Sequence, residues 1–382
     1  MKFSQRLKYM NEAWSRIKAL IVKEILAVWR DKKSRIVLIG PPLIQLIVLS
    51  HAATLDVSNI SIGIYNQDRG EHSYELIQRI KGAPYFTHVY EFESSQEVRH
   101  AIDTQKVLLS LQFQQNFSRL IDGDRQASVQ VTLDGRKSNA SQIVGGYLTL
   151  ILQNLNKDIL IRKGIAVPEP IDIAFRALFN PNLDYVLYTV PCIVGILSMI
   201  LALMVTAMSV SRERENGTFD QLLVSPLQPW QILIGKLIPA MMISIGESTL
   251  LMILALHLFG VPFTGSLILL YCSMVVFLLS IVGIGLFISS ICHTQQQSIL
   301  GSFVFMVPTV LLSGYATPIE NMPYLLQIFS NFIPITHFFI IIKGIFLKNI
   351  PFQEVFMHLW PMALMAIFTL SLAGWMFKRR LE

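Results

Sequence analysis

Long apolar runs alternate with polar stretches along this chain, and several of the apolar runs are long enough to cross a membrane. A helix needs about 20 mostly apolar residues to cross a bilayer core of about 30 Å. Six runs approach or exceed this length, and the first is the weakest because Pro41, Pro42 and Gln45 interrupt it. The six predicted spans cover residues 36–55, 185–210, 230–259, 266–291, 297–315 and 355–377.

Two of the stretches outside these spans have a helical character of their own. Residues 1–35 have apolar positions at helical spacing, including Trp14 and Ile17, with basic residues between them. This pattern predicts an amphipathic helix in the membrane interface, and an ordinary cytoplasmic surface helix is the alternative. Residues 316–354 are too apolar for a free loop, and prolines interrupt them. They are expected to form short helices that re-enter the membrane or lie on its outer surface.

The longest polar stretch, residues 56–184, lies between the first two spans. Short segments with alternating apolar residues predict strands, and segments with helical periodicity lie between and after them. This alternation predicts a small α/β domain with a four-stranded sheet. Strands are expected at 61–67, 86–92, 107–113 and 128–134, and helices at 71–81, 95–104, 116–122 and 138–163.

The composition places the chain in the membrane class, and the distribution of charge gives its orientation. Only 15% of the residues are charged, against about 25% in a typical soluble domain. Lys and Arg gather in residues 1–35 and 378–382, which puts both termini on the cytoplasmic side of six spans. Lys343 and Lys348 would then lie outside, as mild exceptions to this rule. The expected fold is an α-helical integral membrane protein with six transmembrane helices and an extracytoplasmic α/β domain between helices 1 and 2.

The sequence has no common catalytic or metal-binding motif. It contains no G-x-x-x-x-G-K-[ST] P-loop, and no H-E-x-x-H, G-x-S-x-G or C-x-x-C. The three cysteines lie in or at the end of apolar runs, and the eight histidines are scattered. His337 and His358 are expected near the outer interface. We therefore expect no catalytic residue, cofactor or metal site in this chain, and no enzymatic activity of its own.

Glu247 is an acid in the middle of the third predicted span. A charged side chain at this depth costs at least about 2.5 kcal/mol to insert, so it should face protein or a water-filled cavity. Two hypotheses remain open. Glu247 contacts a substrate or cation in a translocation path, or it packs among helices as a protonated or hydrogen-bonded acid, with Ser244 and Ser248 as candidate partners.

The second and third spans are connected by a polar stretch at residues 211–229. Four alternating charges extend the second span, and Asn216-Gly217 is a strong helix breaker. Thr218 and Gln221 have the spacing of a capping box for a short helix with an apolar face, which two prolines would end. Such a helix is suited to docking into a soluble partner, and a plain lipid-avoiding connection is the alternative. The candidate contact residues are Arg212, Glu213, Arg214, Glu215, Asn216, Gly217, Thr218, Phe219, Leu222 and Leu223.

The stretch SRERENGTFDQLLVSPLQPWQILIGK resembles the signature loop of ABC-2-type permeases, with its charged pair, E-x-G-T, L-L-x-x-P and a G-K at the next span. SGYATPIENMP and the following F-x-P-I-T-H-F are also similar to that family. ATLDVSN, LDGRKSNASQI and SSICHTQQQ resemble its YbhR-type efflux group, so the resemblance covers nearly the whole chain. Glu247 departs from that group, where an uncharged polar residue is expected.

This resemblance implies the membrane-spanning permease subunit of an ATP-driven ABC exporter of drug-like compounds or cations in the bacterial inner membrane. ABC ATPase subunits would carry ATP and Mg, and residues 211–229 would form the coupling helix that contacts them. A second permease subunit, identical or homologous, a periplasmic accessory protein and membrane lipids are further expected partners, and nucleic acid is not. The alternatives are an ABC-2 permease that exports lipid or glycan, and a non-transporting membrane scaffold or sensor with an external ligand-binding domain.

Overall fold

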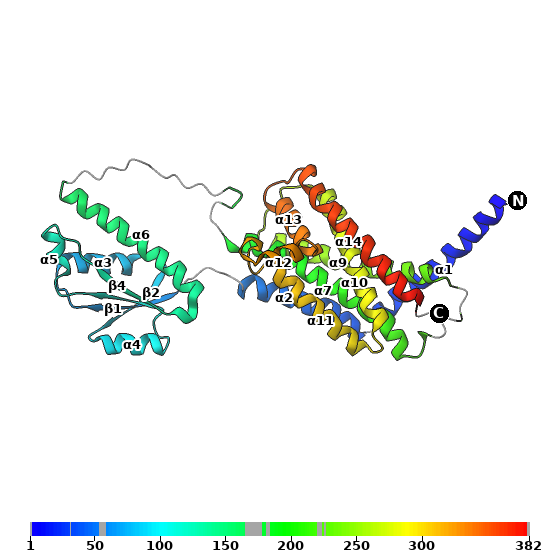
Figure 1. The fold of residues 1–382 in the computed structure, drawn as a ribbon, viewed down its shortest axis with the longest axis horizontal. Helices are drawn as coiled ribbons and strands as arrows, with labels where there is room; N and C mark the ends of the chain where they lie inside the picture. Colours follow the sequence, from blue (N-terminus) through cyan, green and yellow to red (C-terminus); the bar gives the residue numbers. More distant parts are fainter. Residues whose placement is uncertain are drawn as a thin grey trace. The chain divides into compact units, whose positions relative to one another are not determined.

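The chain divides into two compact units. The α/β unit is Thr54–Arg176, and the helical unit combines Met1–Ala53 with Ala177–Glu382. The computed structural model (Figure 1) describes residues 2–30, 32–52, 59–164, 178–180, 184–219, 224 and 227–379.

The α/β unit is built on a four-stranded sheet in the order β2-β1-β3-β4. Strand β1 pairs in parallel with β2 and β3, and β3 pairs antiparallel with β4. Alternating residues of β1, such as Ile62 and Ile64, are buried in the core of the unit. The strands are β1 (Ile60–Asn66), β2 (Phe86–Phe92), β3 (Leu109–Phe113) and β4 (Val129–Leu133), close to the predicted positions.

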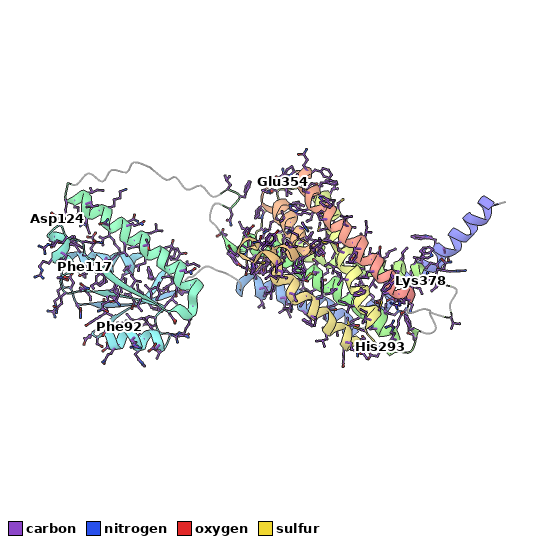
Figure 2. All side chains as sticks on the ribbon, in the orientation of Figure 1. Phe92, Phe117, Asp124, His293, Glu354 and Lys378 are labelled. Carbon is purple, nitrogen blue, oxygen red and sulfur yellow. The ribbon has the colours of Figure 1, made fainter. Side chains whose placement is uncertain are left out.

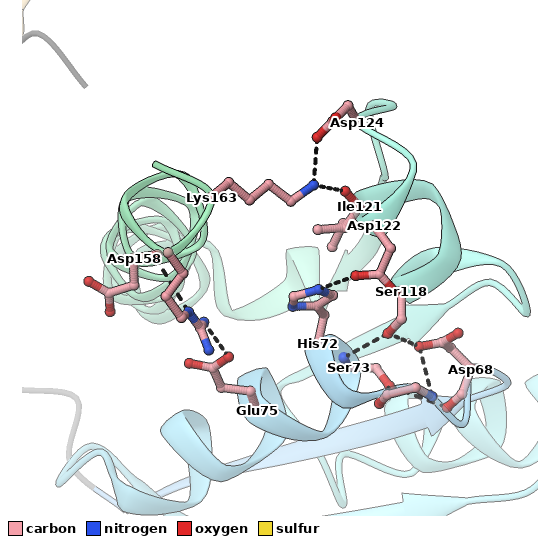
Figure 3. A network of polar contacts seen from close by, with 12 residues as sticks. Asp68, His72, Ser73, Glu75, Ser118, Ile121, Asp122, Asp124, Asp158 and Lys163 are labelled. Atoms are coloured by element: carbon pink, nitrogen blue, oxygen red, sulfur yellow. Dashed lines mark hydrogen bonds and ion pairs between the residues drawn. The ribbon is translucent and has the colours of Figure 1, made fainter. Parts of the chain in front are cut away.

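Helices cover both faces of this sheet. In Figure 1, α3 and α6 lie on one side of the sheet and α4 on the other. Their bounds are α3 (Glu71–Gly82), α4 (Ser95–Asp103), α5 (Phe117–Asp122) and α6 (Ser138–Arg162). Ion pairs tie α6 to its neighbours: Arg162 pairs with Glu75 of α3 at 2.6 Å, and Lys163 pairs with Asp124 at 2.6 Å (Figure 3).

The carboxyl ends of β1 and β3 meet at a position where doubly wound sheets commonly bind ligands. Here the side chain of Asp68, which follows β1, fills this position (Figure 3). Its Oδ2 accepts hydrogen bonds from Ser118 Oγ at 2.6 Å and from the Gly70 amide at 3.2 Å. A Cβ at Gly70 would lie 2.3 Å from the Ser118 side chain. Asp68, Gly70 and Ser118 are therefore packed closely against one another at this position.

The Asp68 carboxylate gives the α/β unit a testable pH dependence. Burial acts to raise the pKa of Asp68, but hydrogen bonds from Ser118, Ser73 and Gly70 outweigh it and lower the pKa below the ordinary value of an aspartate. A lowered pKa contributes stability above the unfolded-state value, and this contribution is lost as pH falls through the folded-state value. We expect Asp68→Asn to destabilise the unit by about 1–3 kcal/mol at pH 7, and the gap to the wild type to close below about pH 4.

Hydrogen exchange of the β1 and β3 amides in the full chain measures this effect. Asp122→Asn is the matched control, because the Asp122 side chain is 69% exposed and its only recorded partner among the described residues is His72. Equal exchange protection in wild type and Asp68→Asn at pH 7 would contradict the assigned role of Asp68.

The helical unit is organised around one central helix, α7 (Tyr185–Glu215), which has buried residues along most of its length. It packs against α2, α9, α10, α11 and α13. Aromatic stacking closes part of the core, with the rings of Phe277 and Phe338 4.3 Å apart and nearly parallel. The other helices are α1 (Lys2–Arg30), α2 (Lys32–Ala52), α9 (Pro229–Leu258), α10 (Leu267–Ile291), α11 (Gln295–Leu312), α12 (Tyr324–Ser330), α13 (Pro334–Leu347) and α14 (Phe352–Arg379).

Four of the described helices are long and apolar enough to cross a membrane: α7, α9, α10 and α14. Helices α12 and α13 form a pair bent by 73°, which is a broken span or a re-entrant loop, so the total is four or five. The sequence pattern predicted six. The difference lies in α2, whose apolar part is only Gly40–Ser50, and in α11, whose first turn contains three glutamines.

Helix α1 has one face packed on the helical unit and another face exposed. Ala13, Ile17 and Leu20 are buried, and α1 packs mainly against α9. A Cβ at Gly235 of α9 would lie 2.3 Å from the Leu20 side chain, so this close approach requires glycine. Trp14 is 61% exposed. The predicted amphipathic helix is therefore present, and its packed face contacts protein.

Candidate coupling site at the end of helix α7

Helix α7 ends at the predicted breaker in a hydrogen-bonded turn. Gly217 has φ +68°, in the left-handed region that favours glycine. Its amide donates to the Arg214 carbonyl at 3.0 Å, and the Thr218 amide donates to the Glu213 carbonyl at 2.9 Å. These two bonds are those of a Schellman motif, with glycine at the expected position. The end of α7 is therefore fixed by its own backbone.

The buried charges at this end form a network that joins three helices. Glu213 of α7 lies 2.8 Å from Lys236 of α9 and 2.7 Å from Lys23 of α1. Lys236 also pairs with Glu24 of α1 at 3.0 Å, and its side chain is only 1% exposed. Ser209 Oγ accepts a further hydrogen bond from the Lys236 ammonium at 3.1 Å. Two carboxylates and two ammonium groups thus compensate one another where α1, α7 and α9 meet.

The next two charges attach α7 to the connection between α10 and α11. The Arg214 guanidinium donates to the carbonyls of Ser290 and Cys292, at 3.0 and 2.9 Å, where α10 ends. Glu215 Oε2 accepts from the amide of Gln295, the first residue of α11, at 2.9 Å. A cation at a helix C-terminus and an anion at an N-terminus both have the favourable sign for the helix dipole.

Phe219 faces the interior of the protein. It is 8% exposed and packs with Leu20, Ile232 and Phe377 in a small apolar cluster. Its ring lies 6.0 Å from that of Phe377, and the Arg214 guanidinium carbon lies 4.8 Å from its centroid. Phe219 therefore holds the turn against α1, α9 and α14, and its ring is not available to a partner in this structure.

The surface left for a partner is smaller than the predicted contact. Asn216 and Gly217 are exposed, Arg212 is half-buried, and Val224 is 88% exposed. Leu222, Leu223 and Gln221 lie outside the described residues, so the predicted capping box and apolar face are not observed. Phe219 and Val224 are both helical.

A shallow pocket of about 330 Å³ opens beside this surface. Residues of α1 and Leu227, which precedes α9, line it: Arg16, Ala19, Leu20, Lys23 and Leu227. Figure 2 shows His293, between α10 and α11, and Lys378 of α14 toward one end of the helical unit, and Glu354 toward the other. Since Arg214 and Glu215 contact residues 290–295, the end of α7 lies at the His293 end.

Four residues of this site were not among the predicted contact residues: Lys23, Glu24, Gly235 and Lys236, of which Gly235-Lys236 is the G-K of the signature loop. The available signal was a lysine just inside an apolar run, because an ionisable residue in a span needs a partner. Glu213 was named as a candidate, but its buried partners come from distant segments of the chain.

Glu247 lies in α9 about three helical turns beyond Lys236. Both of its carboxylate oxygens are buried and without a hydrogen-bond partner among the described residues. The expected partner Ser248 lies 2.7 Å from Ser198 Oγ and 2.6 Å from the Ser244 carbonyl instead. The structure therefore does not place Glu247 in the hydrogen bonds expected from simple packing.

An unpartnered acid in an apolar helix predicts a pH-dependent function. If Glu247 gains or loses a proton during transport, Glu247→Gln should flatten the dependence of the transport rate on pH. Transport by reconstituted wild type and variant, measured across pH, tests this. Glu354→Gln is a control, since that acid is 48% exposed and paired with Lys348. Identical pH profiles for wild type and Glu247→Gln would leave only a packing role.

Among the described residues, no group of three or more His, Cys, Asp or Glu side chains is placed to hold a metal ion. His337 and His358 lie close together, with their Nδ1 atoms 3.2 Å apart. The Asn331 carbonyl lies 3.0 Å from the other ring nitrogen of His337. This pair joins α13 to α14.

Comparison with known proteins agrees with these features. A family model described as "ABC-2 family transporter protein" matches residues 32–375. The chain is 46% identical over 365 residues to the "Probable multidrug ABC transporter permease YbhR" of Escherichia coli (strain K12), covering 96% of this chain and 99% of that protein.

Two further relatives come from the same organism. The identity is 29% over 379 residues to the "Probable multidrug ABC transporter permease YbhS", covering 97% of this chain and 98% of that protein. It is 28% over 319 residues to the "Inner membrane transport permease YhhJ", covering 81% of this chain and 83% of that protein. With its apolar helices and full-length matches, this chain belongs to the ABC-2 transporter family.

Proposed function

We propose that this chain is the membrane-spanning permease subunit of an ATP-driven exporter and that residues 211–229 couple it to a separate ATPase. The observation that carries this proposal is the network at the end of α7. It ties one connection to α1, α9, α10 and α11, and it leaves Asn216, Gly217 and Val224 exposed beside an apolar pocket. A force applied at this surface is transmitted to several helices at once.

The proposed mechanism follows from the attachment of this connection to several helices. ATP and Mg would be held by the partner ATPase, and closure of that partner would displace the end of α7. Because α7 packs along most of the helical unit, its displacement would shift α9, α10 and α11 with it. Access to the translocation path can change only if the ATPase binds the two arrangements with different free energies.

For the membrane arrangement we propose six spans, with α2 and α11 added to the four long helices and the α12–α13 pair re-entering from outside. Both termini would be cytoplasmic and the α/β unit extracytoplasmic, in the inner membrane of a bacterium. Labelling of single cysteines from each side of the membrane tests this. The native Cys192, Cys272 and Cys292 must first be replaced. Labelling of residues 1 and 382 from opposite sides would contradict it.

The proposed partners are ABC ATPase subunits and a second permease, identical or homologous. Helix α11 supports a second permease, because it has a row of exposed apolar residues: Leu300, Phe303, Val304, Val307 and Leu311. A periplasmic accessory protein is a further proposed partner of the α/β unit. The proposed substrates are drug-like compounds or cations, and the word multidrug in the names of two relatives supports the first of these.

Two alternatives are an exporter of lipid or glycan and a non-transporting scaffold or sensor. The sensor is disfavoured by Asp68 and Ser118, which fill the usual ligand position of the α/β unit. Purification of the intact complex separates these functions. The proposal predicts an ATPase in the complex and efflux that fails when Gly217→Pro is combined with Glu215→Lys. A complex without ATPase, together with intact efflux in that variant, would overturn it.

A further inference from the structure

Lys343 is a charged residue in the apolar helix α13, and its ammonium has an unusual environment. The Nζ atom lies 4.7 Å from the centroid of the Tyr188 ring, which belongs to α7. Among the described residues, Lys343 forms no ion pair and no hydrogen bond. Lys343 is half-buried. The ammonium has three donors, and with no ion-pair or hydrogen-bond acceptor recorded among the described residues it is available to pair with an anion from outside the chain.

Other lysines of the helical unit show how this chain usually compensates such charges. Lys236 is paired with two carboxylates, and Lys348, five residues after Lys343, is paired with Glu354 at 2.7 Å. Lys343 has no carboxylate within ion-pair distance among the described residues. A cation–π contact contributes only about 0.5–2 kcal/mol, so it does not replace a counter-ion.

The neighbours of Lys343 add further donors. The rings of Tyr185 and Tyr188 lie 5.9 Å apart. The Tyr188 hydroxyl donates to the Gly314 carbonyl at 3.3 Å. Among the described residues, no hydrogen bond is recorded for the hydroxyls of Tyr185 and Tyr315. The Tyr188 ring that contacts the ammonium is therefore next to the Tyr185 ring and hydrogen-bonded to the residue before Tyr315, and both of these phenols can donate to an anion.

We propose that Lys343, assisted by Tyr185 and Tyr315, binds a phosphate-type anion between α7 and α13, supplied by a phospholipid headgroup or by free phosphate. The apolar surroundings favour the lipid, because α12 exposes Leu325 and Phe329, and the turn that leads from α12 into α13 exposes Phe332. The proposal concerns ligand binding and does not depend on coupling to an ATPase.

The test uses the full-length chain, purified in detergent and stripped of lipid. Phosphatidylglycerol is titrated in, and the bound lipid is counted by native mass spectrometry. In a second arm, thermal stabilisation by inorganic phosphate is compared with that by chloride at equal ionic strength. A charge-assisted hydrogen bond is worth about 1.5–3 kcal/mol, so Lys343→Met should weaken binding about tenfold or more.

Matched variants keep the test independent of folding. Lys343→Arg should retain binding, and Lys348→Met should bind as the wild type does, since that lysine is 38% exposed and already paired. Loss of lipid binding in Lys343→Met assigns the anion to a phospholipid. Loss of phosphate stabilisation, with lipid binding unchanged, assigns it to free phosphate. The proposal is overturned if Lys343→Met binds both ligands as tightly as Lys348→Met does.

Discussion

Replacing Lys236 with methionine is expected to destabilise the protein by about 3–5 kcal/mol, because it leaves buried carboxylates without their cation. The Lys236 side chain is 1% exposed, and it compensates Glu213 and Glu24 at 2.8 and 3.0 Å. In the variant, Glu213 would keep only Lys23, whose side chain is 52% exposed. Glu24 would lose the only ion-pair partner it has among the described residues.

Urea unfolding in detergent micelles, followed by tryptophan fluorescence, measures this change. Lys23→Met is the matched control on the same carboxylate, and it should cost about 1 kcal/mol or less because an exposed ion pair contributes little. Combining Lys236→Met with Glu213→Gln should recover part of the loss, since the uncompensated charge is removed. If Lys236→Met were as stable as Lys23→Met, Lys236 would not be compensating buried carboxylates.

The elements of the α/β unit could be predicted because their signals are local. The strand expected at 86–92 is Phe86–Phe92, and the helix expected at 138–163 is Ser138–Arg162. Alternation of apolar residues and helical periodicity both act within a few residues. The order β2-β1-β3-β4 was not predicted, and neither was the closure of the β1 end by Asp68 and Ser118, because these depend on residues distant in sequence.

In the candidate site, even more of the structure depends on contacts between residues distant in sequence. The end of α7 could be predicted because Asn216-Gly217 is a local signal. The partners of the charged residues before it could not be predicted. Arg214 and Glu215 satisfy the ends of α10 and α11, some 75 residues away along the chain. A run of charges indicates only that polar groups are needed, and their partners are set by the packing of helices. The part of the site available to a partner is therefore narrower than the charged stretch.

Gly217 lies in the exposed part of the site, and its substitution is expected to affect coupling. Its φ is +68°, and a Cβ would meet nothing within 4 Å. A substitution here therefore tests the backbone conformation without a steric clash. A β-branched residue in this conformation costs about 1–2 kcal/mol, whereas asparagine tolerates it. If Asn216 contacts the ATPase as proposed, we expect Gly217→Val to reduce efflux about tenfold, because the turn that presents Asn216 would change, and Gly217→Asn to keep most of it.

Efflux from cells and substrate-stimulated ATP hydrolysis by the purified complex distinguish coupling from folding. Because the strain is confined to the end of α7, Gly217→Val should remain folded in the membrane, with α1 and α9 still joined through Lys236. Its ATP hydrolysis should lose the response to substrate, while Gly217→Asn keeps that response. Equal efflux by the two variants would mean that the conformation at Gly217 is not needed for coupling. The exposed surface that transmits force from the ATPase would then have to lie elsewhere, with the pocket between α1 and Leu227 as the next candidate.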